Sequence, residues 1–408
     1  MAIDDLREAQ SAQFSFPKCE EGSVARLAQS VVEMRRSGIR VVMDLAGTMK
    51  DVIHLEVGEP SFQTPAHIVE AAHRAALEGF TKYTPNVGFL SLREKLVQKL
   101  QRVNGLQTEP DNIVVTPGAV AGIVSSLAAI LEPGDEVLIP DPGWPNNEMM
   151  VIVNRGVPRQ YLLDPANGFI PDLDELEKAI TLRTKAIVIN SPSNPTGAVF
   201  PRATVERLVE IVREHDIFLV SDEVYEQILF DAEHVSARGF DIDGRVISVH
   251  GFSKTYAMTG WRLGYVVASR EVAAMVGKLQ EPLVSCASAV SQKAGEAALD
   301  GPQDCVVEMV EAYRRRRDMA VSMLADLDVP FSRPSGAFYL LVDVSSAAME
   351  SYEFAKLLLK EARVAVAPGA TFGQQSRNHV RLSLATADGQ LAEGIRRLAA
   401  FLRGSRAD

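Results

Sequence analysis

Apolar runs rich in β-branched residues alternate with amphipathic stretches over residues 111–267, and this alternation constrains the fold more than any other feature of the sequence. Continuous apolar strands separated by helices are typical of a largely parallel sheet that is covered on both faces. The predicted strands are Ile113–Val115, Glu136–Ile139, Ala186–Ile189, Ile217–Val220, Val246–Val249 and Gly264–Val267. Turn sequences follow several of them, at the carboxyl edge where open α/β sheets bind ligands.

The pattern changes after about residue 301. A long helix is predicted over Asp304–Leu327, and its basic run Arg314–Arg317 is expected on a solvent-exposed or interface face. Beyond this helix, Ala337–Val342 and His379–Leu384 are predicted to be strands and Tyr352–Ala362 a helix. These elements indicate a smaller α+β domain.

We therefore predict an α/β protein with two domains. The large domain, residues 58–303, would hold a mostly parallel sheet with helices on both faces. Residues 304–408 would form an interdomain helix and a C-terminal small domain. Residues 1–57 would be an N-terminal segment that joins the small domain, which is then built from both chain ends.

The composition excludes several classes of protein. The chain is 47% hydrophobic and 23% charged, which is typical of globular proteins, and no apolar stretch is long enough to span a membrane. Its 42 basic and 53 acidic side chains give a net charge of -11. A surface of this charge repels nucleic acid and anionic lipid, so we expect neither nucleic acid nor membrane as a partner.

Cysteine and histidine usage indicates the compartment and argues against a metal site. Cys19, Cys286 and Cys305 lie far apart, and the acidic start of the chain shows no secretory signal. A reducing cytoplasm is therefore expected. The seven histidines form no H-E-x-x-H motif or His/Cys cluster, so no dedicated metal site is expected.

The densest set of polar loop residues follows the strand that ends at Val249. Common nucleotide-binding and hydrolase motifs, G-x-G-x-x-G, the P-loop and G-x-S-x-G, are absent. Within the loop, Lys254 taken alone fits a surface lysine. Beside Ser253 and Arg262 it also fits an amine that forms a Schiff base next to a phosphate site.

This loop and three further blocks resemble the class I and II aminotransferases of the pyridoxal-phosphate fold-type-I family, the aspartate aminotransferase-like enzymes. The blocks are Ser253-Lys254 with Gly260–Tyr265, Ser191–Gly197, Asp222–Tyr225 and Arg381–Ser383, in the order and spacing of the family. The resemblance implies an enzyme that uses pyridoxal 5′-phosphate to move an amino group between an α-amino acid and a 2-oxo acid by a ping-pong mechanism.

The resemblance also implies roles for individual residues around the pyridine ring. Lys254 would hold the cofactor as a Schiff base and afterwards move the proton at the substrate Cα. Asp222, which follows a strand, would keep the pyridine nitrogen protonated, although its position also suits a helix N-cap. Asn194 and Tyr225 would donate hydrogen bonds to the phenolate oxygen. Trp144 would stack on the ring.

The cofactor phosphate would be bound at a helix start. Gly118, Ala119 and Val120 open a helix directly after a strand, so free backbone N–H groups and the helix dipole face an anion. Ser253 would add a hydroxyl contact and Arg262 a charged one.

Further residues would bind the substrate or join two subunits. Arg381 would grip the α-carboxylate in a bidentate fork, with Asn194 beside it, and Gly58 lies in a loop that would close over the substrate. Tyr83 matches a tyrosine that reaches the phosphate of the neighbouring subunit. The resemblance therefore implies a homodimer with shared active sites.

Two positions depart from the family pattern. Gly251 stands where a serine is common, and Val120 stands where relatives often carry a polar residue. Each departure removes a side-chain contact to the phosphate. Cofactor retention is then expected to depend on backbone amides, Ser253 and Arg262.

The substrate side chain is expected to be neutral. No arginine occurs between Arg270 and Arg314, where ungapped counting places Ser288 at the position of a dicarboxylate-binding arginine, and Val120 replaces a lysine used by other relatives. Aspartate is therefore disfavoured as the best donor. An arginine of the N-terminal segment, such as Arg26 or Arg40, could reverse this expectation if it contacted the substrate side chain.

Two other functions fit parts of the sequence. The same residues would support another reaction of the same carbanion, by a lyase, decarboxylase or oxidase, because substrate geometry selects its fate. A regulatory binding module with an aminotransferase-like domain would require a basic DNA-binding segment, whereas the residues before Glu56 lean acidic.

Overall fold

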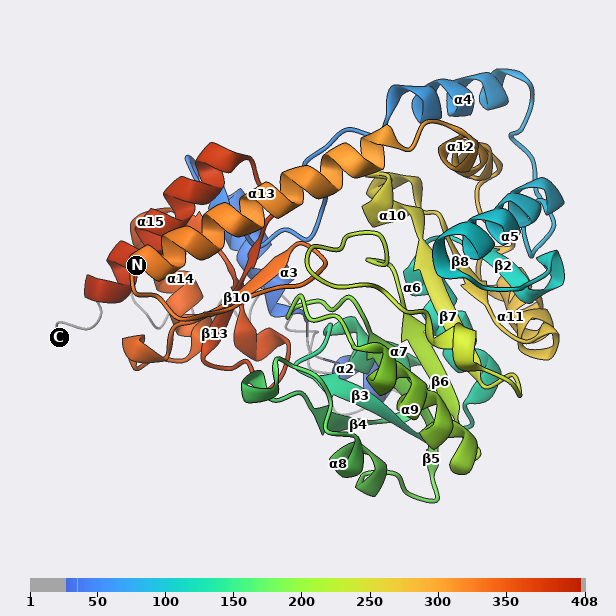
Figure 1. Cartoon of the computed structure of the whole chain (residues 1–408), viewed down its shortest axis with the longest axis horizontal. Helices are drawn as coiled ribbons and strands as arrows, with labels where there is room; N and C mark the ends of the chain where they lie inside the picture. The colour runs from blue at the N-terminus through green and yellow to red at the C-terminus, as the bar shows by residue number, and fades with distance from the viewer. Residues whose placement is uncertain (1–26, 35, 405–408) are drawn as a thin grey trace, which may run out of the picture. The chain divides into compact units, whose positions relative to one another are not determined.

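The computed structural model describes residues 27–34 and 36–404 (Figure 1). The chain divides into two compact units, Met1–Arg35 and Arg36–Asp408. In the first unit, a short helix α2 (Gln29–Val32) is described. All elements below belong to the second unit.

A seven-stranded sheet forms the centre of the larger part of this unit. Its strands, in spatial order, are β2 (Ile113–Thr116), β8 (Gly264–Val267), β7 (Val246–Gly251), β6 (Phe218–Asp222), β5 (Thr184–Asn190), β3 (Glu136–Asp141) and β4 (Val157–Leu162). The pairs from β7 to β4 are parallel, whereas β8 is antiparallel to both β2 and β7. The carboxyl ends of β5, β6 and β7 therefore meet at one edge, as the sequence predicted.

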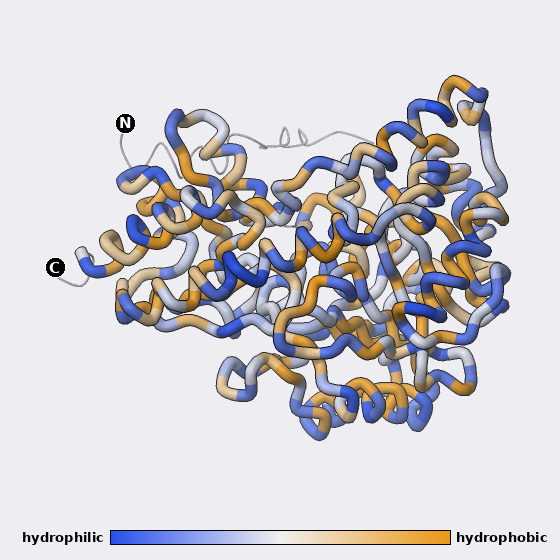
Figure 2. The backbone as a smooth tube through the Cα atoms, turned by 45° about the horizontal axis from the view of Figure 1, so that its top comes forward, coloured by the Kyte–Doolittle hydropathy of each residue, from blue (hydrophilic) through white to orange (hydrophobic). Residues whose placement is uncertain are grey.

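The two faces of this sheet bury alternate residues of each strand. Val188 and Val220 pack against helices on one face, and Ile187 and Leu219 against helices on the other. The first face carries α6 (Ala119–Ile130), α7 (Asn146–Val153) and α11 (Arg270–Val284), and the second carries α4 (Ala66–Leu77), α5 (Leu90–Asn104), α8 (Leu173–Lys178), α9 (Arg202–Glu214) and α12 (Ala289–Asp300). The helices mix hydrophilic and hydrophobic residues along their length (Figure 2) because only one side of each is buried.

The smaller part of this unit contains two further sheets and is built from both ends of the unit. The strands β12 (Ala367–Pro368), β13 (His379–Ser383), β10 (Tyr339–Asp343) and β9 (Phe331–Ser332) form an antiparallel sheet, and β1 (Ile53–His54) pairs in parallel with β11 (Val364–Ala365). The helices α3 (Gly38–Gly47), α13 (Asp304–Asp326), α14 (Ser351–Ala362) and α15 (Asp388–Gly404) share one hydrophobic cluster with these strands. The segment before Val57 thus contributes the strand β1 and the helix α3 to the smaller part of the unit.

The remaining helical turns are short. They are α10 (Phe252–Thr255), η1 (Pro110–Asn112), η2 (Pro165–Asn167), η3 (Ala237–Phe240), η4 (Thr259–Trp261), η5 (Ser345–Ala347) and η6 (Gly369–Thr371). Among residues 27–34 and 36–404, no helix combines the length and the hydropathy that a membrane span requires.

The arginine run on α13 is less exposed than expected. Arg316 and Arg317 are only 8% and 2% exposed. Arg316 Nε donates to Asp388 Oδ1 at 2.7 Å, and Arg317 Nη1 donates to Asp231 Oδ2 at 2.5 Å. The expectation of a solvent-exposed face was therefore wrong for these two residues, because a helix between the two sheets buries part of its charged side and must pair it.

The predicted fold class is confirmed, although the sequence analysis missed β4 of the seven-stranded sheet and the four two-residue strands β1, β9, β11 and β12. β4 was not predicted, because it lies at the edge of the sheet, contains Pro158 and leaves most of its residues accessible to solvent. The domain boundaries at residues 57 and 303 stay a prediction.

Candidate active site

A cavity of about 610 Å³ lies where the carboxyl ends of β5, β6 and β7 face β10 and β13. Eleven predicted site residues line it. They are Gly58, Ala119, Val120, Trp144, Asn194, Asp222, Tyr225, Ser253, Lys254, Arg262 and Arg381. Gly251 lines it as well. Four blocks far apart in the sequence therefore come together in one place.

Lys254 reaches the cavity from the short helix α10, which begins directly after β7. Its Nζ donates a hydrogen bond to the Gly58 carbonyl oxygen at 2.8 Å. Burial, together with the nearby Arg381 and Arg262 cations, lowers the pKa of Lys254 to about 8. An amine with this pKa is partly neutral near physiological pH, which suits a nucleophile or a general base.

Asp222 ends β6 and is only 5% exposed. Its Oδ1 accepts a hydrogen bond from Val224 N at 3.3 Å. Burial raises the pKa of Asp222 to about 7, and the neighbouring Glu223 carboxylate adds to this rise. A cation in the cavity beside Asp222 would favour its ionised form.

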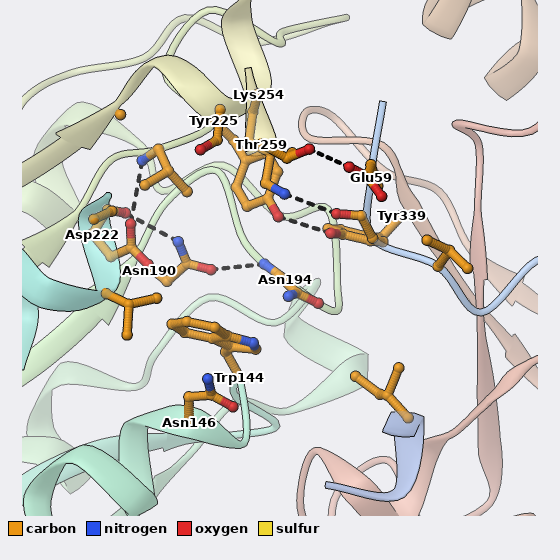
Figure 3. A pocket seen from close by; sticks show the side chains of 18 of the residues that line it. Glu59, Trp144, Asn146, Asn190, Asn194, Asp222, Tyr225, Lys254, Thr259 and Tyr339 are labelled. Atoms are coloured by element: carbon orange, nitrogen blue, oxygen red, sulfur yellow. Dashed lines mark hydrogen bonds between the residues drawn. The ribbon is translucent and has the colours of Figure 1, made fainter. Parts of the chain in front are cut away.

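Asn190 connects the ends of β5 and β6 (Figure 3). Its Nδ2 donates to the Asp222 carbonyl oxygen at 3.0 Å, and its Oδ1 accepts from Asn194 N at 2.8 Å. Asn194 Oδ1 in turn accepts from Arg381 Nη1 at 2.8 Å. The amide NH₂ of Asn194 is then left as a donor for a ligand.

Tyr225 and Tyr339 both line the cavity, and their hydroxyl groups are in contact. Their hydroxyl oxygens lie 2.8 Å apart (Figure 3). Burial and the neighbouring Tyr339 raise the pKa of Tyr225 far above its ordinary value. Both phenols therefore stay protonated and can donate hydrogen bonds.

The start of α6 forms a cradle for an anion. Gly118 has a φ of 82°, and a Cβ added to it would lie 2.6 Å from Arg262 Nη2. The Arg262 guanidinium therefore lies against the first turn of α6, where no side chain caps the backbone N–H groups. Ser253 lines the same cavity. This set of donors fits a phosphate.

Trp144 lies on the loop after β3, and its ring borders the cavity below Asn194 in the close view (Figure 3). The loop is fixed at its base, because Asp141 accepts hydrogen bonds from Gln374 N at 3.0 Å and Gln375 N at 3.1 Å. An aromatic ring held in this way fits the face of a planar ligand.

Arg381 on β13 is only 1% exposed and has donors to spare. Its Nη2 donates to the Glu56 carbonyl oxygen at 2.5 Å, and its Nε has no hydrogen-bond partner. The guanidinium lies 4.3 Å from the centroid of the Tyr339 ring. A buried cation with an unused donor fits a carboxylate ligand.

Two predicted site residues do not line the cavity. Gly118 lies directly beside it, against Arg262. Tyr83 is 88% exposed and lies outside the cavity of its own chain. Its predicted role concerns a neighbouring subunit, so that role stays a prediction.

Sequence reasoning missed several residues that line the cavity. They are Ser37, Ile39, Met43, Val57, Glu59, Asn146, Asn190, Val224, Thr259, Gly260 and Tyr339. Asn190 directly precedes the Ser191–Gly197 block and could have been found from its position at a strand end. The residues of α3 carried no such signal. Of the two N-terminal arginines considered, Arg40 lines the cavity and Arg26 lies outside the described residues.

A buried charged cluster lies behind Asp222. Glu223, Glu226 and His250 bring their ligand atoms within 4.8 Å of one another, close enough to hold a metal ion. However, Lys99 already pairs with Glu226, and His234 Nε2 lies 3.0 Å from Glu223 Oε2. We read the cluster as an ion-pair network, and the lack of a dedicated metal site stays a prediction.

Comparisons with known proteins agree with this geometry. The family model described as aminotransferase class I and II matches residues 50–398. An aspartate/prephenate aminotransferase from Thermus thermophilus is 41% identical over 374 residues, which cover 91% of this chain and 93% of that protein. Aromatic-amino-acid aminotransferase 2 from Thermococcus litoralis is 38% identical, covering 90% of this chain and 96% of that protein. A solved structure of the Thermus thermophilus aspartate aminotransferase with maleate has a TM-score of 0.89 at 40% identity, covering 92% of this chain and all of that one.

Proposed function

Because the chain belongs to the class I and II aminotransferases and is an aminotransferase, we propose that it moves an amino group from a neutral α-amino acid to a 2-oxo acid in a ping-pong reaction on pyridoxal 5′-phosphate. The observation that carries this proposal is the meeting of Lys254, Asp222 and Arg381 in one cavity. Lys254 supplies a nucleophilic amine, and Asp222 a carboxylate that can keep a pyridine nitrogen protonated. Arg381 supplies a cation that can bind a carboxylate.

The cradle and the polar groups around it bind the cofactor. The first turn of α6, Ser253 and Arg262 would hold the phosphate, and Asp222 would keep the pyridine nitrogen protonated. The Asn194 amide and the Tyr225 hydroxyl would donate hydrogen bonds to the phenolic oxygen. Bound pyridoxal phosphate supplies an electron-withdrawing ring that stabilises negative charge at the substrate Cα.

Lys254 acts twice. Its amine would hold the cofactor through the aldehyde group and, when free, would move the proton at the substrate Cα. The pKa of about 8 supports both steps, because the amine can gain and lose a proton near neutral pH.

Arg381 and Gly58 position the substrate. The unused donors of Arg381 bind the α-carboxylate in a fork. Gly58 supports close approach of the backbone, since a Cβ there would lie 2.5 Å from Tyr339 Oη. The Gly58 carbonyl oxygen accepts from Lys254 and keeps the amine at the substrate position.

A neutral donor fits the apolar part of the cavity wall. Ile39, Met43, Val57 and Val120 line it, and Arg381 is the cation buried in it. Packing of an apolar substrate side chain against these residues gains free energy through burial. The alternative, another reaction of the same carbanion in a lyase, decarboxylase or oxidase, uses the same groups and differs in its products.

We also propose a cytoplasmic homodimer with shared active sites. Tyr83 is highly exposed, as a residue that reaches another subunit must be. Cys286 and Cys305 are free thiols, which supports a reducing compartment.

A panel of amino donors with pyruvate as acceptor tests the substrate proposal. We expect kcat/KM for alanine or phenylalanine to exceed that for aspartate by at least about 10-fold, since Arg381 is the one fully buried cation among the described residues that line the cavity. Aspartate as the best donor would contradict the neutral preference while leaving aminotransferase activity intact.

A further inference from the structure

Residues 255–262, which we call the Arg262 turn, hold their backbone in two unfavourable conformations. Ala257 has a φ of 51° and Arg262 a φ of 50°, both in the left-handed region that residues with a Cβ rarely adopt. Such conformations persist only where surrounding contacts fix them, and they are common at ligand-binding sites. Because the Arg262 guanidinium lies against the first turn of α6, the contacts that fix this turn also fix the candidate phosphate site.

One side chain from a distant part of the sequence bonds to the Arg262 turn at two places. Thr64, in the segment between β1 and α4, donates its hydroxyl hydrogen to the Ala257 carbonyl oxygen at 2.7 Å. The same Oγ1 accepts a hydrogen bond from Trp261 Nε1 at 3.0 Å. A hydroxyl can donate and accept at once, so both bonds form together. Thr64 is therefore bonded to one left-handed residue and to the residue that precedes the other.

A further contact from the same segment is more exposed. Thr259 Oγ1 donates to a Glu59 carboxylate oxygen (Figure 3), and the Thr259 carbonyl oxygen accepts from Arg262 Nη1 at 2.8 Å. Water competes for the exposed bond to Glu59, whereas both bonds of Thr64 are partly buried. Partial burial strengthens a hydrogen bond, so Thr64 restrains the turn more firmly than Glu59 does.

We propose that Thr64 is a positioning residue for the cofactor phosphate. It fixes the backbone of the Arg262 turn and thereby holds the Arg262 guanidinium at the start of α6. Thr64 itself is not among the described residues that line the cavity, so it acts through the turn. This inference rests on the proposed function, in which pyridoxal phosphate occupies the cavity. Affinity for the phosphate group then depends on Thr64, and affinity for the pyridine ring does not.

The substitution Thr64→Val tests this role, because valine has nearly the shape of threonine and makes neither hydrogen bond. Equilibrium dialysis of the full chain measures the dissociation constants of pyridoxal phosphate and of pyridoxal, which has the same ring and aldehyde but no phosphate. We expect Thr64→Val to raise the constant for pyridoxal phosphate by about 10-fold, and that for pyridoxal by less than about 2-fold, when two hydrogen bonds are lost. Thr64→Ser keeps the hydroxyl and should bind both ligands as the parent does.

Thr386→Val is the matched control. Thr386 Oγ1 also donates to a distant backbone carbonyl oxygen, that of His54, at 2.8 Å, and Thr386 is not among the described residues that line the cavity. This variant should leave both dissociation constants unchanged. Trp261→Phe removes the other donor and keeps an aromatic ring, so it should change the ratio of the two constants in the same direction by about 3-fold. It carries the test if Thr64→Val does not fold.

The comparison of the two ligands separates positioning of the phosphate site from a general structural role. Equal losses for both ligands, or unchanged binding of both, would overturn the role of Thr64. A parent chain that binds the two ligands equally well has no phosphate site, which would overturn it too. If the parent chain binds no pyridoxal phosphate, the proposed function itself fails. If it prefers pyridoxal phosphate and the ratio does not change in Thr64→Val, only the inference on Thr64 fails.

Discussion

In the proposed function, Lys254 meets two requirements with one side chain, because it would attach the cofactor and also exchange a proton. Free lysine has a pKa near 10.4, and burial lowers that of Lys254 to about 8. The neutral amine is the nucleophile. The rate at which pyridoxal phosphate attaches to cofactor-free protein should thus rise about tenfold per pH unit below pH 8 and level off above it.

Stopped-flow absorbance across this pH range measures the attachment rate. Free Nα-acetyl-lysine serves as the control and should show its inflection more than two units higher. An inflection of the protein reaction near the value for free lysine would mean that Lys254 is not held in the buried environment described here.

Asp222 should matter far more to chemistry than to folding. Asp222→Asn keeps the volume and a hydrogen-bonding group but removes the charge that, in the proposed function, would hold a proton on the pyridine nitrogen. We expect proton transfer at the substrate Cα to slow by about 100-fold or more, the usual loss when one such electrostatic stabiliser is removed. Single-turnover spectroscopy measures the step, and Asp216→Asn, at an exposed site, is the control. If the variant binds cofactor and reacts at the parent rate, Asp222 has only the structural role of a helix cap.

At the residue scale, the sequence predicted side chains that would contact the cofactor or the substrate. It missed the neighbouring side chains that hold those residues in position. Asp222 and Asn194 lie in recognisable blocks. Asn190 acts by bonding backbone atoms of two different loops, and Tyr339 comes from a strand far along the chain. Such contacts depend on tertiary packing, which cannot be read from the local pattern of residues in the sequence.

At the element scale, the carboxyl ends of the parallel strands determine where the candidate site lies. β5, β6 and β7 are neighbours and run in parallel, so the residues that follow them share one edge. The sequence predicted this edge because apolar strands and their turns are local signals. It did not predict that α3 would line the cavity, because an amphipathic helix does not show from its own residues which surface it covers.

A substitution of Gly118 tests whether the cradle at the start of α6 binds the cofactor phosphate. Gly118→Ala adds a Cβ 2.6 Å from Arg262 Nη2 and should displace the guanidinium from the phosphate site. We expect the dissociation constant for pyridoxal phosphate to rise by at least about 10-fold, as when one charged contact is lost.

Gly134→Ala is the matched control for this change. Gly134 also has a positive φ, of 94°, but a Cβ there meets nothing within 4 Å. Both variants carry the backbone strain, and only Gly118→Ala disturbs Arg262. Equal cofactor affinity in the two variants would show that the cradle does not bind the phosphate.

At the scale of the whole molecule, the site depends on both sheets. Arg381 from the four-stranded sheet contacts Asn194 from the larger part, although the two residues are 187 positions apart in the sequence. The sequence identified both residues through the family blocks. Their contact could not be predicted from spacing, because it requires the packing of one sheet against the loops of another.

A shared active site can be tested by mixing subunits. Tyr83→Phe and Lys254→Ala chains should each form weakly active or inactive homodimers, and their hybrid has one site with both lesions and one with neither. Random pairing of equal amounts leaves about a quarter of all sites intact, so activity should rise on mixing. Activity no higher than that of the two homodimers, with subunit exchange shown by mass spectrometry, would argue against a contribution of Tyr83 across subunits.

The fate of the donor nitrogen tests the central claim most directly. Purified protein with bound pyridoxal phosphate is given alanine labelled at its amino nitrogen and an excess of 2-oxoglutarate, and the products are analysed by mass spectrometry. The account predicts that the label moves to newly formed glutamate in equal amount to the pyruvate released, and that Lys254→Ala abolishes the transfer. Label released as ammonia, or alanine consumed without a labelled second amino acid, would contradict it.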